Sequence, residues 1–233
     1  MKRLLISLLA LFSTGALNAQ FIVGWSGGWA PSRELNREIY VYNLLNGPNL
    51  KKEMGEVHWY QGVVAGFTTP GEGKFVELLY NRKRCLVTSE FDSAGVPMQR
   101  QLKVLCNTWN LGIGFRSDGW TVGLSWDFGR FKGKGRRGPE SGIGDLPFDR
   151  LWVLDKTRLL GIAAARLFCQ ETIFVQRDFG PVGVRAFVQI AGTYNDMDGL
   201  DAWLFGGDLN YAVAQRQGFA NFGVAVTVKV GKQ

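Results

Sequence analysis

The most constraining feature of the sequence is a strict two-residue alternation that runs from Trp120 to Gly129. Its even positions carry large apolar side chains: Trp120, Val122, Leu124, Trp126 and Phe128. Its odd positions carry small or polar ones: Thr121, Gly123, Ser125, Asp127 and Gly129. Successive side chains of a β-strand point to opposite faces, so this pattern predicts a strand with one large apolar face and one small polar face.

The same division recurs along most of the chain, and it decides which face points outward. Apolar faces turned inward would overfill a core and leave mostly glycine outside, whereas apolar faces turned outward form a lipid-facing band with aromatic edges. We therefore predict an all-β fold, an eight-stranded antiparallel up-and-down transmembrane β-barrel. The predicted strands are 21–29, 56–68, 74–92, 98–116, 120–132, 157–175, 182–193 and 219–230.

The connections between these strands differ in length in a regular way. Long extracellular loops are predicted at 32–55, 133–155 and 194–218, and short periplasmic turns at 69–73, 117–119 and 177–181. This asymmetry is typical of bacterial outer-membrane barrels. An even number of strands lets the first and last strands pair, so that no unpaired backbone edge meets lipid. Residues 157–175 leave two interpretations open, because LLGIAAARLF also fits a helix, which would contradict the barrel.

The N-terminal segment predicts export from the cytoplasm. Lys2 and Arg3 precede a short apolar run, and residues 17–19 approximate a small-residue cleavage site, so 1–19 is expected to be a cleaved signal peptide. Residues 20–233 then form one barrel domain in the outer membrane. The formal net charge is +7. An exported chain rarely meets nucleic acid, however, and we expect no nucleic-acid partner.

The last predicted strand carries a motif that is shared with a known class of proteins. Its sequence NFGVAVTV places a polar residue and a glycine ahead of spaced apolar residues, which resembles the assembly signal of outer-membrane barrels. The chain ends in GKQ and lacks the usual terminal aromatic residue. Over nearly all of 20–233 it resembles the small outer-membrane β-barrel proteins of Gram-negative bacteria, in their Bacteroidota form. That resemblance implies a cell-envelope role, such as a component of secretion or gliding machinery.

The width of the barrel bears on transport. Eight strands enclose a space just wide enough to be filled by side chains, so we predict a filled, non-porin interior. Four charged residues have inward parity, and buried charges must pair, so we expect them to form a neutralising polar plug. These residues are Glu77, Asp127, Arg185 and Lys229.

Three functional classes remain open. The favoured one is a binding or structural barrel whose long loops meet another envelope protein, because those loops hold exposed aromatic residues that need a packing partner. These aromatics are Phe148, Trp152, Trp203 and Phe205. The first alternative is an outer-membrane enzyme that modifies lipid A. The second is a soluble secreted barrel that binds a small apolar ligand inside.

The sequence offers little for catalysis. His58 is the only histidine, it is predicted to point inward beside Tyr60, and no serine motif stands near it. It is a weak catalytic candidate, and we expect the protein not to be an enzyme. No CxxC motif or His–Cys cluster is present, so we predict no metal and no cofactor.

A set of basic residues shares the outward parity of its strands just beyond the apolar band. We predict that they form a crescent that binds phosphorylated lipid or lipopolysaccharide headgroups. The alternative is a solvated rim that makes no lasting lipid contact. The predicted set comprises Arg82, Arg84, Arg130 and Lys132, with Arg136 and Arg137 in the adjoining loop.

The three cysteines argue against a disulfide framework, because their number is odd. Cys85 and Cys106 nevertheless both point inward on neighbouring strands of one hairpin. If the turn is centred between Gly95 and Val96 they lie directly opposite, and a cross-strand disulfide is geometrically allowed. A shift of two residues in pairing makes them diagonal and unbonded.

Overall fold

The computed structural model describes residues 19–151, 153–154, 158–159, 162–163, 168–192, 194–196, 198–205, 217–218 and 220–230. Except for its last residue, the predicted signal peptide lies outside this described part. The long strands are β1 (Gln20–Trp29), β3 (Trp59–Thr68), β4 (Gly73–Ser93), β5 (Val96–Ser117), β6 (Trp120–Pro139), β11 (Phe168–Phe179), β12 (Val182–Ala191) and β15 (Asn221–Val230). The short strands are β2 (Leu50–Lys52), β7 (Asp149–Arg150), β8 (Val153–Leu154), β9 (Arg158–Leu159), β10 (Ile162–Ala163), β13 (Tyr194–Asp196) and β14 (Gln217–Gly218). The helices are α2 (Arg33–Asn46) and α3 (Asp198–Phe205), with 3-10 turns η1 (Gly47–Asn49) and η2 (Glu140–Asp145).

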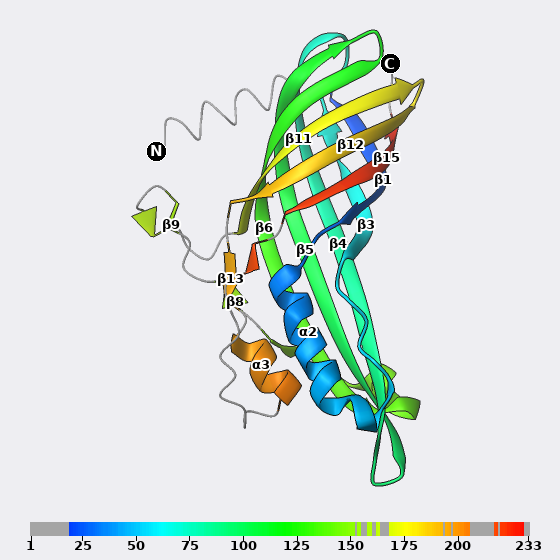
Figure 1. The fold of residues 1–233 in the computed structure, drawn as a ribbon. Coiled ribbons are helices and arrows are strands. Elements are labelled where there is room, and N and C mark those ends of the chain that lie inside the picture. Colours follow the sequence, from blue (N-terminus) through cyan, green and yellow to red (C-terminus); the bar gives the residue numbers. More distant parts are fainter. Residues whose placement is uncertain are drawn as a thin grey trace.

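The eight long strands form a closed antiparallel ring (Figure 1). Each pairs with the next long strand along the chain, from β1–β3 through to β12–β15. The ring closes where β15 pairs with β1 over nine residue pairs, among them Trp25 with Val226. The predicted pairing of the first and last strands is therefore confirmed, and no long strand of the ring is left with an open edge.

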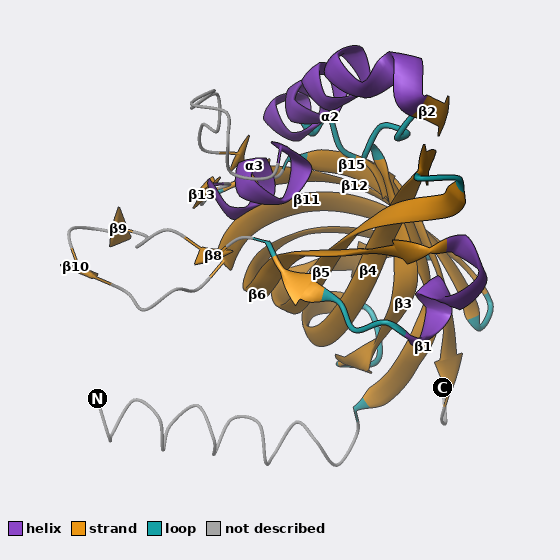
Figure 2. Ribbon diagram, turned by 90° about the horizontal axis from the view of Figure 1, so that it is seen from below, coloured by secondary structure: helices purple, strands orange, loops and turns teal. Residues whose placement is uncertain are grey.

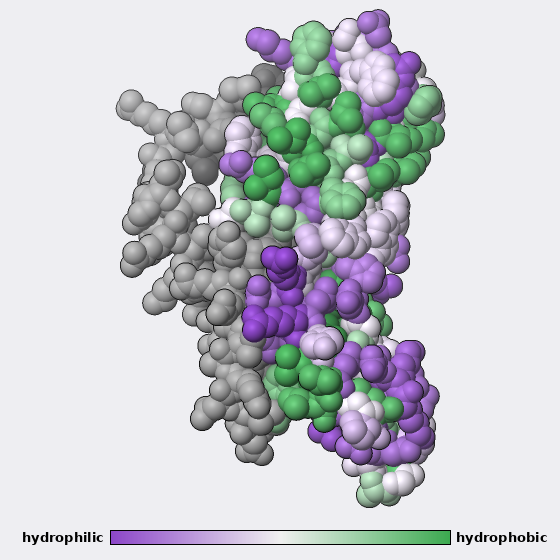
Figure 3. Space-filling model, viewed as in Figure 1, coloured by the Kyte–Doolittle hydropathy of each residue, from purple (hydrophilic) through white to green (hydrophobic). Residues whose placement is uncertain are grey.

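Large apolar side chains cover the outside of this ring. Phe115 of β5 and Val122 of β6 are each 57% exposed, whereas Thr121, the residue before Val122, is 1% exposed. In Figure 3 the hydrophobic side chains gather in the upper half of the molecule, over the strands β11, β12 and β15 of Figure 1. The predicted orientation, with apolar residues outward and small or polar ones inward, is what the ring shows. None of the described helices is long and apolar enough to cross a membrane.

Three strands continue far beyond the ring at the end opposite the short turns. Strand β4 loses its partner β3 after Arg84, and β6 loses β11 after Gly129. The β4–β5 hairpin nevertheless stays paired as far as Ser93 and Val96, with β6 alongside. We call this extension, residues 85–104 and 130–139, the projection. Figure 2, viewed from this end, shows α2 and α3 beside the strands rather than inside the ring.

Helix α2 forms because its apolar residues recur at helical spacing and meet the projection. Leu35, Ile39 and Tyr42 lie on one face of α2 and are fully buried or nearly so. Together with residues of β4, β5, β6 and α3 they form one hydrophobic core. Its buried members are Ala30, Leu35, Ile39, Tyr42, Met54, Val57, Tyr60, Val87, Leu102, Val104, Cys106, Phe131, Leu151, Leu200 and Leu204.

The predicted long loop 32–55, whose apolar residues REIYVYNLL also allow a helical turn, contains a helix of 14 residues, α2. The loop predicted to begin at 133 was wrong in part, because β6 runs on to Pro139. The physical reason is that outward alternation of apolar residues ends at Phe128, while pairing with β5 keeps the backbone extended. In segment 194–218, α3 occupies residues 198–205.

The sixth predicted strand is shifted relative to the structure. Strand β11 begins at Phe168 rather than 157 and continues to Phe179, so the turn expected at 177–181 is confined to Gly180 and Pro181. Residues 168–175 are a strand and not a helix. Most of 157–167 lies outside the described residues.

Candidate functional site

The inside of the ring holds a buried ion pair between two of the predicted plug residues. Arg185 donates two hydrogen bonds to the Glu77 carboxylate, from Nη1 and Nη2, each 2.7 Å long. The guanidinium also lies 3.8 Å from the centroid of the Phe174 ring, and its Nε donates to Gln176 at 2.9 Å. This bidentate pair is satisfied on all sides, as a buried ion pair must be.

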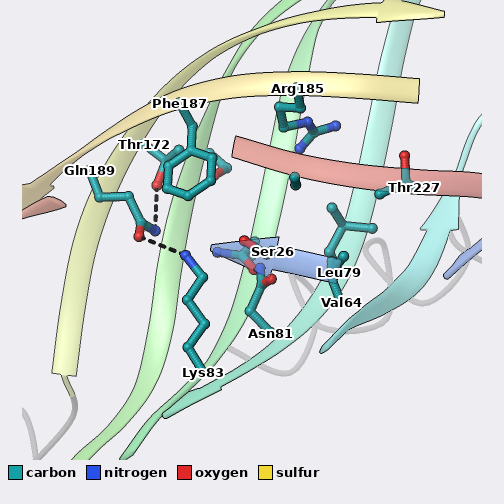
Figure 4. A pocket seen from close by; sticks show the side chains of 13 residues that line it. Ser26, Val64, Leu79, Asn81, Lys83, Thr172, Arg185, Phe187, Gln189 and Thr227 are labelled. Carbon is teal, nitrogen blue, oxygen red and sulfur yellow. Dashed lines mark hydrogen bonds between the residues drawn. The ribbon is translucent and has the colours of Figure 1, made fainter. Parts of the chain in front are cut away.

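Asp127, a third predicted plug residue, is buried without an ion pair among the described residues. Its carboxylate accepts hydrogen bonds from Ser125 at 2.8 Å, Thr172 at 2.6 Å and Gln189 at 2.5 Å. The Gln189 amide connects this carboxylate to Lys83, whose Nζ donates to Gln189 Oε1 at 3.3 Å (Figure 4). Charge is thus balanced through a hydrogen-bond chain rather than by contact.

Lys83 was missed as an interior residue by the sequence analysis. It lies between Arg82 and Arg84 in a basic run and is not among the plug residues predicted above. Its inward parity was the available signal, and the structure shows it 4% exposed with Nζ 4.3 Å from the Phe187 ring centroid.

The fourth predicted plug residue is linked to the Glu77–Arg185 pair through two side chains. Lys229 forms an ion pair with Asp178 at the short-turn end of the ring. Asp178 accepts a hydrogen bond of 2.7 Å from Gln176, whose Oε1 accepts one from Arg185. Nearby, Arg116 donates to the carbonyl oxygens of Thr69 at 3.1 Å and Gly71 at 3.2 Å. A cavity of about 30 Å³ lies beside Arg185, Lys83 and Gln189, with room for one or two water molecules.

His58 does not point inward, so this prediction was wrong. Its side chain is 46% exposed, and Nδ1 lies 3.9 Å from a carboxylate oxygen of Glu56. Strand β3 begins only at Trp59, and the chain before it bends toward α2, where Val57 donates its backbone N–H to Asn36 at 2.7 Å. Val57 is therefore buried, and the strand parity assumed for His58 does not apply.

The two cysteines of the hairpin are diagonal. The turn consists of Ala94 and Gly95, both with positive φ, which places Ser93 opposite Val96. In this register Cys85 faces Val104, and Cys106 faces Lys83. All three cysteines of the chain are free thiols.

We expect three free thiols per chain when the purified protein is titrated under denaturing, non-reducing conditions. The expectation follows from the offset of two residue pairs between Cys85 and Cys106, so that neither cysteine is the direct cross-strand neighbour of the other. A reduced and denatured sample provides the reference count. A count of one thiol in the non-reduced sample would contradict the register.

Four of the six predicted crescent residues share the outer face of β4 and β6. Arg82 and Arg130 flank Asn107 of β5, and the next row holds Arg84 and Lys132. The same face continues with Lys103 and Lys134. Neither belongs to the predicted set: Lys134 lies beyond the predicted end of its strand at 132, whereas Lys103 has the outward parity of the predicted strand 98–116.

The other two predicted crescent residues have different roles. Arg136 donates to Gln101 at 2.9 Å and to the carbonyl oxygens of Gly144 and Leu146, which fixes the segment after β6 to the projection. Arg137 has the opposite parity and lies 5.0 Å from the Phe91 ring. Arg137 is therefore not placed to act with the four on the outer face, whereas Arg136 lies on that face one row beyond Lys134 and is engaged with Gln101 and the segment after β6.

The aromatics predicted to need a partner pack in part on cations of the projection. The guanidinium of Arg100 lies 5.3 Å from the Trp203 ring and 4.9 Å from Tyr42, and donates to the Leu204 carbonyl at 2.9 Å. Phe148 lies 4.3 Å from the Arg136 guanidinium. Trp152 lies outside the described residues.

Comparison with known proteins gives a distant structural similarity. No family model matches this sequence, and no similarity to a curated protein was found. Among solved structures, the chain is similar to Ail, the attachment invasion locus protein of Yersinia pestis, in complex with the heparin analogue sucrose octasulfate. The TM-score is 0.37 at 10% sequence identity, over 90% of this chain and 97% of that chain. Values of this size assign no family, and the proposals below rest on strand pairing and side-chain placement.

Proposed function

We propose that this chain is an eight-stranded β-barrel of the Gram-negative outer membrane, closed to diffusion, whose projection binds another component of the cell envelope. The observation that carries the proposal is the placement of side chains in the ring, which is the reverse of that in a water-soluble protein. Apolar side chains lie outside, and the interior is polar and hydrogen-bonded. In water such an outer surface would be a very large exposed apolar patch. In lipid it is the expected surface of a spanning barrel.

The dimensions of the apolar band support this placement. The segment from Trp120 to Phe128 has the roughly 9–11 residues with which a tilted strand crosses the hydrocarbon core. Aromatic pairs lie at its edge toward the projection, where Tyr80 and Trp109 have ring centroids 5.1 Å apart. Aromatic girdles at membrane interfaces are typical of such barrels. The short turns then face the periplasm and the projection faces outward from the cell.

Both ends of the ring are filled, which supports a role other than transport. The ion pair of Glu77 and Arg185 occupies the middle, and Arg116 fills the short-turn end. At the other end, Tyr60 of β3 is fully buried in the core beneath α2. The cavity of about 30 Å³ beside the ion pair has room for only one or two water molecules.

We expect the reconstituted protein to show no steady ion conductance in planar lipid bilayers. The physical reason is the side-chain filling of the eight-stranded ring. Slower migration of the boiled than of the unboiled sample on a gel shows that the barrel is folded in the same preparation. Discrete, reproducible conductance steps from folded protein would refute the closed interior.

The projection and the helix α2 that packs on it support a binding role, because one hydrophobic core orders them and they offer exposed side chains far from the membrane. On α2, Tyr40 is 64% exposed and Leu44 is 67% exposed, on the side opposite the buried face. Arg33 and Arg37 share that exposed side. The sequence resemblance to Bacteroidota barrels favours an envelope protein, such as a component of secretion or gliding machinery, as the partner.

The two alternative functions have less support. A lipid A-modifying enzyme would need His58 beside a nucleophile or a water-activating group, but His58 is exposed and lies next to Glu56 alone among the charged described residues. The proposed role is therefore non-enzymatic, and an assay for release of acyl chains from lipid A tests it. A soluble barrel for an apolar ligand would need an apolar cavity, whereas the interior is polar and filled.

A further inference from the structure

The outer faces of the adjacent strands β4, β5 and β6 carry six cations where these strands leave the ring and enter the projection. They are Arg82, Arg84, Lys103, Arg130, Lys132 and Lys134, which we call the basic patch. The cross-strand rows are Arg82–Asn107–Arg130, Arg84–Leu105–Lys132 and Leu86–Lys103–Lys134. Neighbouring strands lie about 5 Å apart and successive same-face rows about 7 Å apart. All six backbone positions therefore fall within an area of roughly 10 by 14 Å.

The positive charge of the basic patch is not neutralised by the described part of the chain. None of the six side chains forms an ion pair or a hydrogen bond with a described residue, and Lys103 has only the Phe148 ring, 5.2 Å from Nζ. Burial, and after it the charges of Arg84 and Arg82, lower the pKa of Lys103. Cations that repel one another in this way gain from a shared anion.

The basic patch continues directly from the apolar band. The next row toward the ring is Tyr80–Trp109–Phe128, and beyond it the outer face is apolar. Aromatic residues of this kind mark the edge of the hydrocarbon. The cations therefore lie one to three rows past that edge, at about 7–20 Å, and their long side chains span the headgroup layer.

We propose that the basic patch binds phosphorylated headgroups of outer-leaflet lipid, whose acyl chains lie along the apolar band below. The proposal rests on the proposed membrane-spanning barrel. A lipid is favoured over a soluble polyanion because the anionic and apolar surfaces are continuous, so one molecule with a phosphate head and acyl chains contacts both. Arg and Lys together suit a headgroup with more than one phosphate, since Arg binds phosphate through paired donors.

The test compares two variants of equal charge change in the full-length protein. The patch variant replaces Arg84, Lys103, Lys132 and Lys134 with Gln. The control variant replaces four exposed cations of α2 and β2 with Gln, at the same end of the ring but outside the basic patch. They are Arg33, Arg37, Lys51 and Lys52. Each protein is refolded in neutral detergent, and its boiled and unboiled migration on a gel is compared. This step tests the barrel separately from lipid binding.

Binding is then measured with mixed micelles that contain diphosphorylated lipid A, with the same lipid after phosphatase treatment as reference. We expect the parent and the control variant to prefer the phosphorylated lipid, and the patch variant to bind it about tenfold or more weakly. The preference of the parent should fall at high salt, since headgroup contacts at the surface are screened. Inositol hexakisphosphate serves as a soluble polyphosphate competitor and should compete poorly.

Three outcomes would overturn the proposal while leaving the barrel intact. They are equal lipid affinity of the patch variant and the parent, equal affinity of the parent for the dephosphorylated lipid, and tighter binding of inositol hexakisphosphate than of the lipid. If the patch variant does not fold, the double variant Arg84→Gln/Lys132→Gln replaces it, with Arg33→Gln/Arg37→Gln as its control. Failure of the parent itself to show heat-dependent migration counts against the barrel instead.

Discussion

Replacing Glu77 with Gln is expected to lower the free energy of unfolding by about 3–5 kcal/mol. The substitution keeps the shape of the side chain but removes the charge that accepts two hydrogen bonds of 2.7 Å from Arg185. The guanidinium is then left buried and uncompensated, because its remaining contacts are the Phe174 ring and the Gln176 amide. Urea-induced unfolding in detergent micelles or lipid vesicles measures the loss.

The control and the double variant separate the pair from a general effect of charge. Glu72 is exposed in the turn between β3 and β4, and Glu72→Gln should change stability by no more than about 0.5 kcal/mol. Removing both charges, by Glu77→Gln with Arg185→Met, should cost clearly less than the two single losses added together. Strict additivity of the two losses would show that the residues do not interact.

The ring could be predicted from the sequence because the closed geometry restricts the residue type at almost every position. At several inward positions a Cβ would strike the backbone of the next strand. A Cβ on Gly62 would lie 1.7 Å from the carbonyl oxygen of Arg82, and one on Gly66 would lie 2.0 Å from that of Leu78. Inward glycine and outward apolar residues therefore alternate for steric reasons, and the alternation is visible without a structure.

Only part of the projection could be predicted in this way. The sequence predicts the long hairpin of strands 74–92 and 98–116, which extends beyond the apolar band, but not the continuation of β6 past Lys132. Outward positions of β6 become basic after Phe128, so the pattern that marked the strand disappears although pairing with β5 continues. Its inner face is instead covered by α2, which is distant in sequence. The burial of Val57 and the exposure of His58 both follow from that packing, and no local pattern encodes it.

Residues whose neighbours depend on register were also beyond the sequence. Parity alone places Cys85, Cys106 and Lys83 inside, but a change of one residue in the turn at Ala94 and Gly95 decides which of them face each other. Parity likewise groups Lys229 with Glu77, but it does not show that Asp178 and Gln176 join Lys229 to the Glu77–Arg185 pair. The inward charges were identifiable as a set, and their pairing was not.

Replacing Tyr42 with Ala is expected to detach α2 from the projection and leave the ring folded. Tyr42 is 2% exposed, its hydroxyl lies 3.2 Å from Ser89 Oγ, and its ring lies 4.9 Å from the Arg100 guanidinium. Loss of a buried aromatic side chain of this size costs about 3–5 kcal/mol. The cost falls on the projection, because the ring has its own network of strand pairing and interior hydrogen bonds. Hydrogen exchange should show loss of protection in α2, and limited proteolysis should cut there first.

Tyr40 provides the matched control, because it lies two residues away on the same helix but is 64% exposed. Tyr40→Ala should change the free energy of opening of α2, measured by hydrogen exchange, by no more than about 0.5 kcal/mol. Heat-dependent migration on gels should persist in both variants, which shows that the ring is intact. If Tyr42→Ala abolished that migration, the projection and the ring would be one cooperative unit. If the proposed binding role resides in the projection, Tyr42→Ala should abolish capture of an envelope partner although the barrel is folded. Tyr40→Ala is expected to keep α2 folded, so a loss of capture by that variant would be assigned to the exposed surface of α2.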